Sequence, residues 1–158
     1  MLRSRVTIGR SGRWRPLLLG ALMLASCNGV TAPSQADTRD LSNALRQWLL
    51  TAPPSYELTM TVKCFCPPDI TRPVRVTVRD GSVVSRHYAD DGTPYLSRFT
   101  PPTVDELFEV ISRATQAGAH VEATYDPTYG HPRAVFIDGS PRVADDETWY
   151  ALSPLRPL

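Results

Sequence analysis

Two cysteines separated by one residue, Cys64 and Cys66, are the side chains of this 158-residue chain best suited to covalent chemistry. A Cys-x-Cys pair can form a disulfide, a redox couple or half of a metal site, and the redox state of the compartment decides between them. The remaining cysteine, Cys27, lies close to the N-terminus. The N-terminal sequence therefore has to be interpreted before the pair.

The first 26 residues have the pattern of a secretory signal. Residues 1–15 contain five arginines and no acidic residue, and an apolar run over 17–25 ends in Leu24-Ala25-Ser26-Cys27. This run is about half the ~20 residues that a membrane-spanning helix needs, and small residues precede the expected cleavage site. Leu-Ala-Ser-Cys resembles the lipobox of bacterial lipoproteins. We predict a lipoprotein signal peptide over residues 1–26 and a lipid on Cys27; the alternative is a soluble exported protein in which Cys27 is incidental.

Removal of the signal changes the charge of the protein. The full chain has 17 basic and 16 acidic residues, and loss of the five arginines leaves 12 basic residues and a net charge of −4. Nucleic-acid binding depends on Lys and Arg side chains that neutralise phosphates, so we expect no nucleic-acid partner. We expect an exported protein of the bacterial cell envelope, attached to a membrane through its N-terminal lipid.

The mature chain divides into a short tether and one domain. Residues 28–37 (NGVTAPSQAD) are small and polar, which predicts a flexible tether over residues 27–37 that includes the lipidated cysteine. Residues 38–158 have the length of a single globular domain. We therefore expect the domain to lie close to the lipid surface.

Two helices are predicted in this domain. The first runs from Asp40 to Leu50 and ends before two prolines, and the second begins at Thr103 and ends near Gly118. Thr103 and Glu106 have the spacing of a capping box. Apolar residues at helical spacing predict the buried stripes. These stripes are Leu41, Ala44, Leu45, Trp48 and Leu49 in the first helix, and Val104, Leu107, Phe108 and Ile111 in the second.

The other segments predict strands. Alternation of apolar and polar residues marks residues 56–66, 74–79 and 82–88, and later 121–125, 134–137 and 148–152. The order is helix, three strands, helix, three strands. This order predicts an α+β fold in which two helices pack on one face of an antiparallel sheet of about six strands. The repeated Asp-Gly turns at Gly81 and Gly139 also raise the alternative of an internal duplication.

Several motifs together resemble a bacterial lipoprotein family, the domain of unknown function 6174. They include the Cys64-x-Cys66 pair and the Thr103–Phe108 helix start. The turn that follows reads Tyr125-Asp126-Pro127-x-Tyr129-Gly130-x-Pro132, and the resemblance covers Asp40 to about Leu152. It implies a small exported or lipid-anchored domain without an assigned activity. The departure is His131, where the family pattern leads us to expect an aromatic residue such as Tyr. We treat Tyr125, Asp126, Tyr129, Gly130 and His131 as a candidate interaction turn.

Within an oxidising compartment, the cysteine pair is predicted to form an intramolecular disulfide. Cys27 carries the lipid, so Cys64 and Cys66 are the two remaining thiols. In a regular strand, alternate residues lie ~6.5–7 Å apart, whereas the Cβ atoms of a disulfide are about 3.8 Å apart. The chain must therefore curl at Phe65. The alternatives are a redox dithiol and a metal site, although the three histidines have no metal-ligand spacing with the cysteines.

Carboxylates provide the other candidate sites. Calcium binds six to eight oxygen ligands, and five acidic residues are candidates although their spacing matches no EF-hand loop. These candidates are Asp126, Asp138, Asp145, Asp146 and Glu147. Asp90 and Asp91 are paired, as hydrolysis requires, but lie in a loop without a partner base. The sequence predicts no cofactor and no catalytic residue.

These observations favour a lipid-anchored envelope protein that binds or scaffolds a partner, which is expected to be another envelope protein. By analogy of fold alone, small domains with helices on an antiparallel sheet often have such roles. The alternative is a thiol-redox or hydrolytic enzyme of the envelope. A buried disulfide favours the structural interpretation of the cysteines, and an exposed thiol of low pKa favours the redox enzyme.

Overall fold

The computed structural model describes residues 35–140 and 142–158, with the side chains of residues 35–37 left out. The predicted signal peptide, Cys27 and most of the predicted tether lie outside the described residues. The first helix, α1 (Gln35–Thr51), begins five residues before the predicted start. Within the described part of the chain, no helix is both long and apolar enough to cross a membrane.

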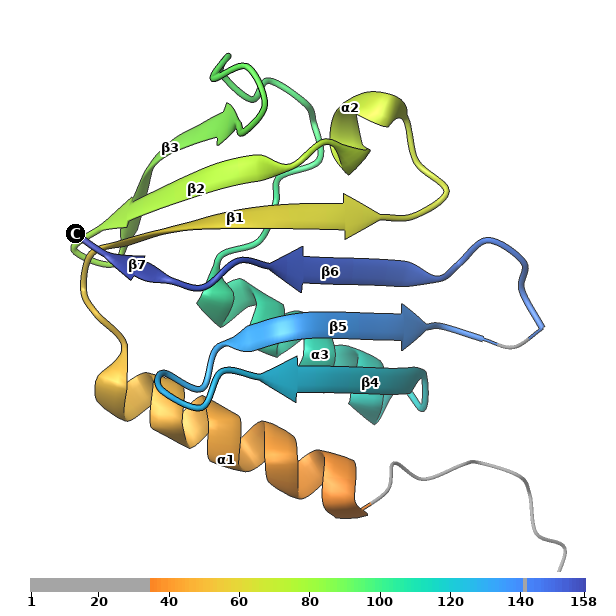
Figure 1. The fold of residues 1–158 in the computed structure, drawn as a ribbon. Helices are drawn as coiled ribbons and strands as arrows, with labels where there is room; N and C mark the ends of the chain where they lie inside the picture. The colour runs from red at the N-terminus through yellow and green to blue at the C-terminus, as the bar shows by residue number, and fades with distance from the viewer. Residues whose placement is uncertain (1–34, 141) are drawn as a thin grey trace, which may run out of the picture.

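Seven antiparallel strands form one sheet (Figure 1). The predicted α+β class and antiparallel sheet are confirmed. The strands are β1 (Tyr56–Lys63), β2 (Val74–Arg79), β3 (Ser82–Tyr88), β4 (His120–Tyr125), β5 (Pro132–Asp138), β6 (Thr148–Leu152) and β7 (Arg156–Pro157). Their order is β3-β2-β1-β6-β5-β4, and β7 pairs with the start of β1. Two elements were not predicted, the two-residue strand β7 and the short helix α2 (Pro68–Thr71).

The helix α3 (Val104–Gln116) begins at the predicted capping box. The Thr103 side chain accepts a hydrogen bond from the Glu106 amide at 3.2 Å, and the Glu106 carboxylate accepts one from the Thr103 amide at 2.7 Å. Gly118 follows the helix with a φ of +80°, a conformation that glycine adopts without steric cost. All four residues of the predicted apolar stripe are buried.

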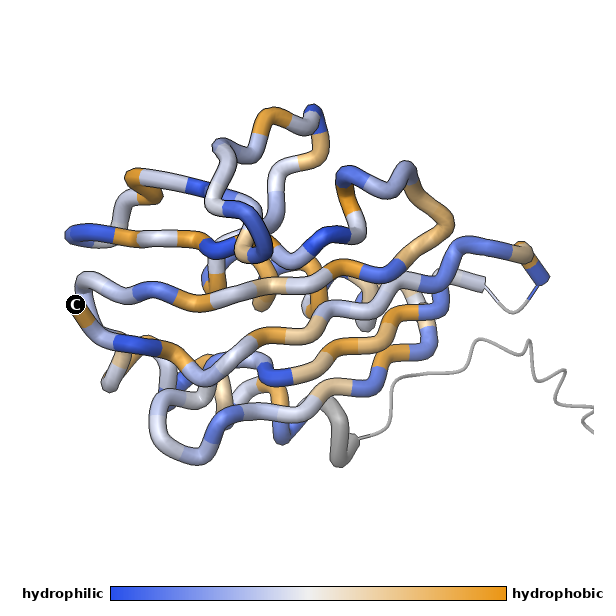
Figure 2. The backbone as a smooth tube through the Cα atoms, turned by 45° about the horizontal axis from the view of Figure 1, so that its top comes forward, coloured by the Kyte–Doolittle hydropathy of each residue, from blue (hydrophilic) through white to orange (hydrophobic). Residues whose placement is uncertain are grey.

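One core lies between the helices and the inward face of the sheet. Hydrophobic and hydrophilic residues alternate along the strands, which directs one set of side chains inward (Figure 2). The Trp48 ring lies edge-on to Tyr56, with 5.6 Å between the centroids, and the Trp48 indole donates a hydrogen bond to Asp105 at 2.9 Å. Burial raises the pKa of Tyr56 to about 12, and the charge of Asp105 adds to this effect. These contacts join α1, β1 and α3.

Two details of the predicted core are wrong. Leu49 is 70 % exposed, because the turn of α1 that buries Trp48 directs Leu49 away from the sheet. The strand predicted over residues 56–66 ends at Lys63, and the chain then turns so that the Cys66 amide donates to the Cys64 carbonyl at 2.8 Å. This turn is the curl that the cysteine spacing required.

The topology argues against an internal duplication. The units β1-β2-β3 and β4-β5-β6 are both antiparallel and occur in the same direction across the sheet, but β4 runs opposite to β1. A rotation within the plane of the sheet reverses both strand direction and strand order, whereas here the direction alone is reversed. The rotation that reverses strand direction alone has its axis across the strands and exchanges the two faces of the sheet. Since buried residues of α1 and α3 belong to the same core, such a rotation cannot superpose the two halves.

Candidate functional site

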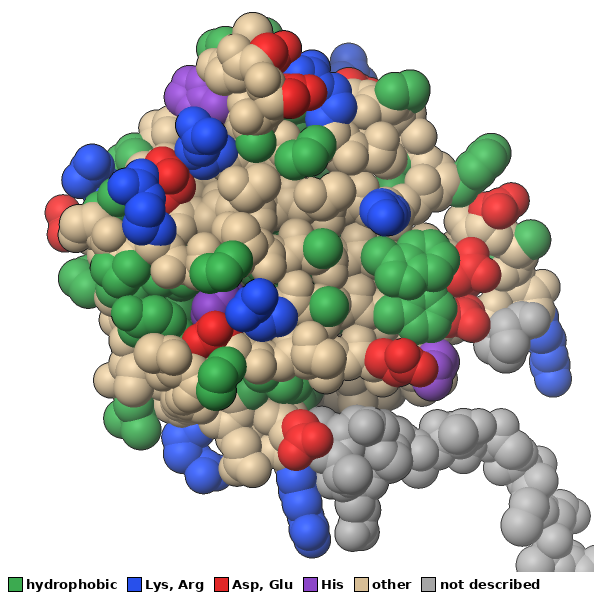
Figure 3. Space-filling view, viewed as in Figure 1, with side chains coloured by type: hydrophobic (Ala, Val, Ile, Leu, Met, Phe, Trp, Pro, Cys, Tyr) green, Lys and Arg blue, Asp and Glu red, His purple; other side chains and the backbone are tan. Residues whose placement is uncertain are grey.

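The outward face of the sheet carries a groove over four neighbouring strands, β1, β6, β5 and β4. Figure 1 views the sheet from this side, with α3 behind it. The groove has a volume of about 620 Å³. Figure 3 shows the same face, where hydrophobic side chains gather across neighbouring strands among polar surface. The face is therefore open along the part of the sheet where outward side chains are apolar.

Strand register arranges the groove residues in two rows across the strands. In one row, Lys63 is opposite Trp149, Trp149 is opposite Phe136, and Phe136 is opposite Glu122. In the next row, the order is Thr61, Ala151, Ala134 and Thr124. Residues directly opposite in antiparallel strands project to the same face. The first row is thus an aromatic ridge with a cation at one end and an anion at the other, beside a floor of alanines between threonines.

The ridge is formed by two aromatic side chains in contact. The rings of Phe136 and Trp149 have centroids 4.8 Å apart and planes tilted by 32°. Trp149 remains 45 % exposed, which is unusual for a large aromatic side chain on a structured strand. A partly exposed aromatic pair next to small residues provides a surface suited to binding an apolar group.

The cysteine pair lies at the edge of this groove. Cys64 contributes to the lining, and the Cys64 and Cys66 sulfur atoms are joined in a disulfide with 5.2 Å between the Cα atoms. Both cysteines are half-buried, whereas Phe65 between them is 84 % exposed. The bridge therefore closes the turn that follows β1 and fixes the end of the strand that carries Lys63.

The candidate interaction turn connects β4 to β5 and holds this hairpin on α1. The Asp126 carboxylate accepts hydrogen bonds from the amides of Thr128 and Tyr129, each at 2.9 Å. The Gln47 side chain of α1 donates to the carbonyls of Pro127 and Thr128, at 2.6 and 3.0 Å. These bonds give the Asp-Pro-x-Tyr motif an architectural role.

Gly130 and His131 complete the contact between this turn and the core. Gly130 has a φ of +78°, and a Cβ at this position would lie 2.4 Å from the carbonyl oxygen of Ala44. His131 is fully buried, and its ring centroid lies 6.3 Å from that of Trp48. Burial lowers the pKa of His131, and the nearby Asp126 carboxylate partly offsets the effect. A partner cannot contact His131 unless the turn opens.

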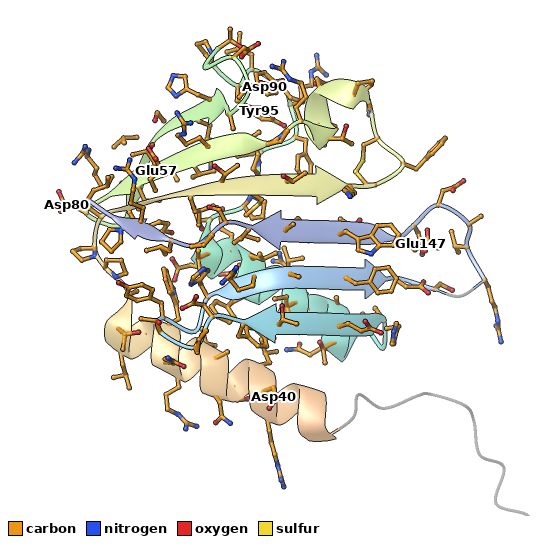
Figure 4. The ribbon with its side chains drawn as sticks, viewed as in Figure 1. Asp40, Glu57, Asp80, Asp90, Tyr95 and Glu147 are labelled. Carbon is orange, nitrogen blue, oxygen red and sulfur yellow. A yellow bond between two sulfur atoms is a disulfide. The ribbon has the colours of Figure 1, made fainter. Side chains whose placement is uncertain are left out.

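The structure separates Asp126 from the other calcium candidates. Asp126 follows β4 at one end of the hairpin, whereas Asp138 at the end of β5 and Glu147 just before β6 lie at the opposite end, where Ile137 pairs with Thr148 (Figure 4). The Asp145 and Asp146 side chains belong to the loop before Glu147. Within residues 35–140 and 142–158, no group of three or more His, Cys, Asp or Glu side chains has the arrangement of a metal site.

The paired carboxylates at Asp90 and Asp91 are bound to an arginine. The Arg72 guanidinium donates to Asp90 at 3.0 Å through Nε and to Asp91 at 2.8 Å through Nη2, and lies 3.7 Å from the centre of the Tyr88 ring. Hydrogen bonds from Thr93, followed by the bond from Arg72, lower the pKa of Asp91 to about 2. The hydrogen bond from Arg72 lowers the pKa of Asp90. General acid–base catalysis near neutral pH needs a pKa near 7, so this pair does not support the hydrolytic alternative.

The groove was not predicted from the sequence. The outward positions of two strands, Ala134, Phe136, Trp149 and Ala151, are apolar, whereas β1 has Glu57, Thr59, Thr61 and Lys63 at its outward positions. This difference in polarity could have indicated that β5 and β6 carry an apolar outward surface. That the strands are neighbours could not be predicted in this way, because β6 pairs with β1 across about 90 residues of chain.

The fold and this face define a small α+β protein in which α1 and α3 share a core with an antiparallel sheet whose outward face carries a groove. The chain belongs to a family of unknown function (DUF6174), whose model matches residues 40–157. This finding confirms the family to which the motifs pointed. No curated protein and no solved structure shows significant similarity to the chain.

Proposed function

We propose that this protein is a lipid-anchored protein of the bacterial cell envelope whose domain binds a partner through the groove on the outward sheet face. The observation that best supports this proposal is the partly exposed aromatic pair Phe136–Trp149 beside the alanine floor. Burial of apolar area is favourable by about 25 cal/mol per Å². A partner that covers these two exposed rings would therefore be bound more tightly by the apolar area it buries. Leu24-Ala25-Ser26-Cys27 supports the anchoring part of the proposal.

Photo-cross-linking in intact envelopes tests the binding part. A photoreactive amino acid replaces Ala151, which lies at the centre of the groove, in the full chain. The matched control places the same amino acid at Arg46, an exposed position on α1. We expect adducts from position 151 alone, and we expect Trp149→Ser to reduce them. Equal labelling from positions 151 and 46, or no adduct from position 151, would reject the groove as a binding site.

The competing function is a thiol-redox enzyme, and the observation in its favour is that Cys64 lines the groove. A catalytic pair must exchange readily in the native state, whereas a structural disulfide resists reduction until the fold is loosened. Alkylation and mass spectrometry with mild reductant separate the two. Rapid reduction of the native protein, at a potential near those of oxidoreductases, would favour the enzyme.

A further inference from the structure

We infer that the groove binds a second copy of this chain in a face-to-face dimer. The two-fold axis lies between the two facing sheets, runs parallel to the strands and passes over the gap between β6 and β5. This inference rests on the proposed binding function and names its partner. It is drawn from the order of residue types across the four strands. The order is cation, aromatic, aromatic, anion in one row, and Thr, Ala, Ala, Thr in the next.

A two-fold interface brings the same patch of both copies together, so the patch must complement itself. An axis between β6 and β5 reverses the order of strands, which places Lys63 opposite Glu122 of the second copy. The same operation places Trp149 opposite Phe136 of the second copy. In the second row it matches threonine with threonine and alanine with alanine. Each position in both rows thus meets a residue of compatible chemistry.

Two facing sheets with aligned strands can also be related by a two-fold axis that runs across the strands. The charges of Lys63 and Glu122 favour the axis parallel to the strands. An axis across the strands would place each strand opposite its own copy, and would bring the two Lys63 side chains near one another and the two Glu122 side chains near one another. The strand-parallel axis separates like charges by the width of the patch. Three inter-strand spacings of ~4.8 Å put the Cα atoms of Lys63 and Glu122 about 14 Å apart. Glu122 also contacts His120 at 3.1 Å, and the Glu122 side chain remains 71 % exposed.

Sheet packing permits the arrangement. Two sheets pack ~10 Å apart with their strands about 30° from alignment, and a two-fold axis that bisects this angle preserves the pairing of the rows. The patch is small, because four strands and about five residues cover roughly 20 by 17 Å. A standard interface buries about 800 Å² on each partner. We therefore expect a weak dimer that forms when a common membrane surface raises the effective concentration.

The test uses charge reversal in two differently tagged full-length chains that are co-expressed and cross-linked in intact envelopes. One chain carries a photoreactive amino acid at Thr124, and the adduct between the two tags is quantified. Lys63→Glu in both chains places a second carboxylate opposite Glu122, and Glu122→Lys in both chains places a second ammonium group opposite Lys63. We expect either change to reduce the adduct about tenfold, since each converts two attractive pairs into repulsive ones.

The decisive combination is Lys63→Glu in one chain with Glu122→Lys in the other. Both pairs across the axis are then again of opposite charge, so the adduct should return to the unsubstituted level. This restoration also shows that both variants fold. Arg46→Glu, which reverses an exposed charge on α1, is the control and should leave the adduct unchanged.

Three outcomes overturn the inference. If the mixed pair gives as little adduct as two chains that carry the same substitution, the Lys63–Glu122 pairing does not exist. If position 124 cross-links reproducibly to a different protein and not to the second tag, the groove binds that protein; the second copy is then rejected, while the proposed binding function stands. If neither position 124 nor position 151 yields any adduct, the binding function fails as well.

Discussion

Among the glycines of positive φ in the described part of the chain, Gly130 is the one at which replacement by alanine should destabilise the protein most. Gly130 has a φ of +78°, and the new Cβ would lie 2.4 Å from the Ala44 carbonyl oxygen and 3.0 Å from the Gln47 Cβ. The left-handed conformation costs an L-residue ~1–2 kcal/mol. Relieving the contact requires the β4–β5 turn to move away from α1, and such overpacking costs ~1–3 kcal/mol. We expect a loss of about 2–5 kcal/mol in the free energy of unfolding.

Gly92→Ala is the matched control. Gly92 has a φ of +73°, but nothing lies within 4 Å of the added Cβ, so only the conformational cost of ~1–2 kcal/mol should remain. Urea denaturation followed by tryptophan fluorescence measures both variants, and buried Trp48 reports on the contact. With a slope of ~1–3 kcal/mol per molar urea, the two midpoints should differ measurably. Equal losses for the two variants would refute the close packing of the turn on α1.

Four further outcomes are expected. Thr103→Ala should lower the free energy of unfolding by ~1 kcal/mol through loss of the cap, and an unchanged denaturation midpoint would contradict this role. Reduction of the Cys64–Cys66 bridge should cost only ~1–2 kcal/mol, because the ring is small; global unfolding on reduction would contradict this. Because burial lowers the pKa of His131, the unfolded chain binds more protons below about pH 6.5, so stability should fall as pH falls below that value. His131→Phe should flatten this limb in denaturation measured across pH. Cys27→Ser should abolish labelling by a fatty-acid probe, and persistent labelling would reject the lipobox.

Local signals in the sequence predicted local structure well. The capping box of Thr103 and Glu106 is present in both directions, and the Asp80–Gly81 turn joins β2 to β3 with positive φ at both residues. Each of these features is decided by side chains within four residues of one another. The helix stripe was less reliable at Leu49, because the position at which a helix leaves the core depends on the elements packed against it.

Features that depend on strand order could not be predicted in the same way. The outward positions of β5 and β6 become a continuous surface only because β6 lies between β1 and β5. A single sequence shows which residues of a strand share a face, but it does not show which strand is the neighbour. The groove therefore required the pairing of Lys63 with Trp149 and of Phe136 with Glu122.

Apart from the Cys64–Cys66 pair at the edge of the groove, the motifs that carry the family resemblance lie away from the proposed binding surface. Asp126 and Gly130 of the turn motif hold the β4–β5 hairpin on α1, at the core side of the sheet. Phe136 and Trp149 project from the opposite face, and a substitution there leaves the contacts of the turn intact. A chain can thus keep this scaffold while its groove changes. Membership of the family therefore predicts the architecture, whereas the partner has to be established from the groove residues of this chain.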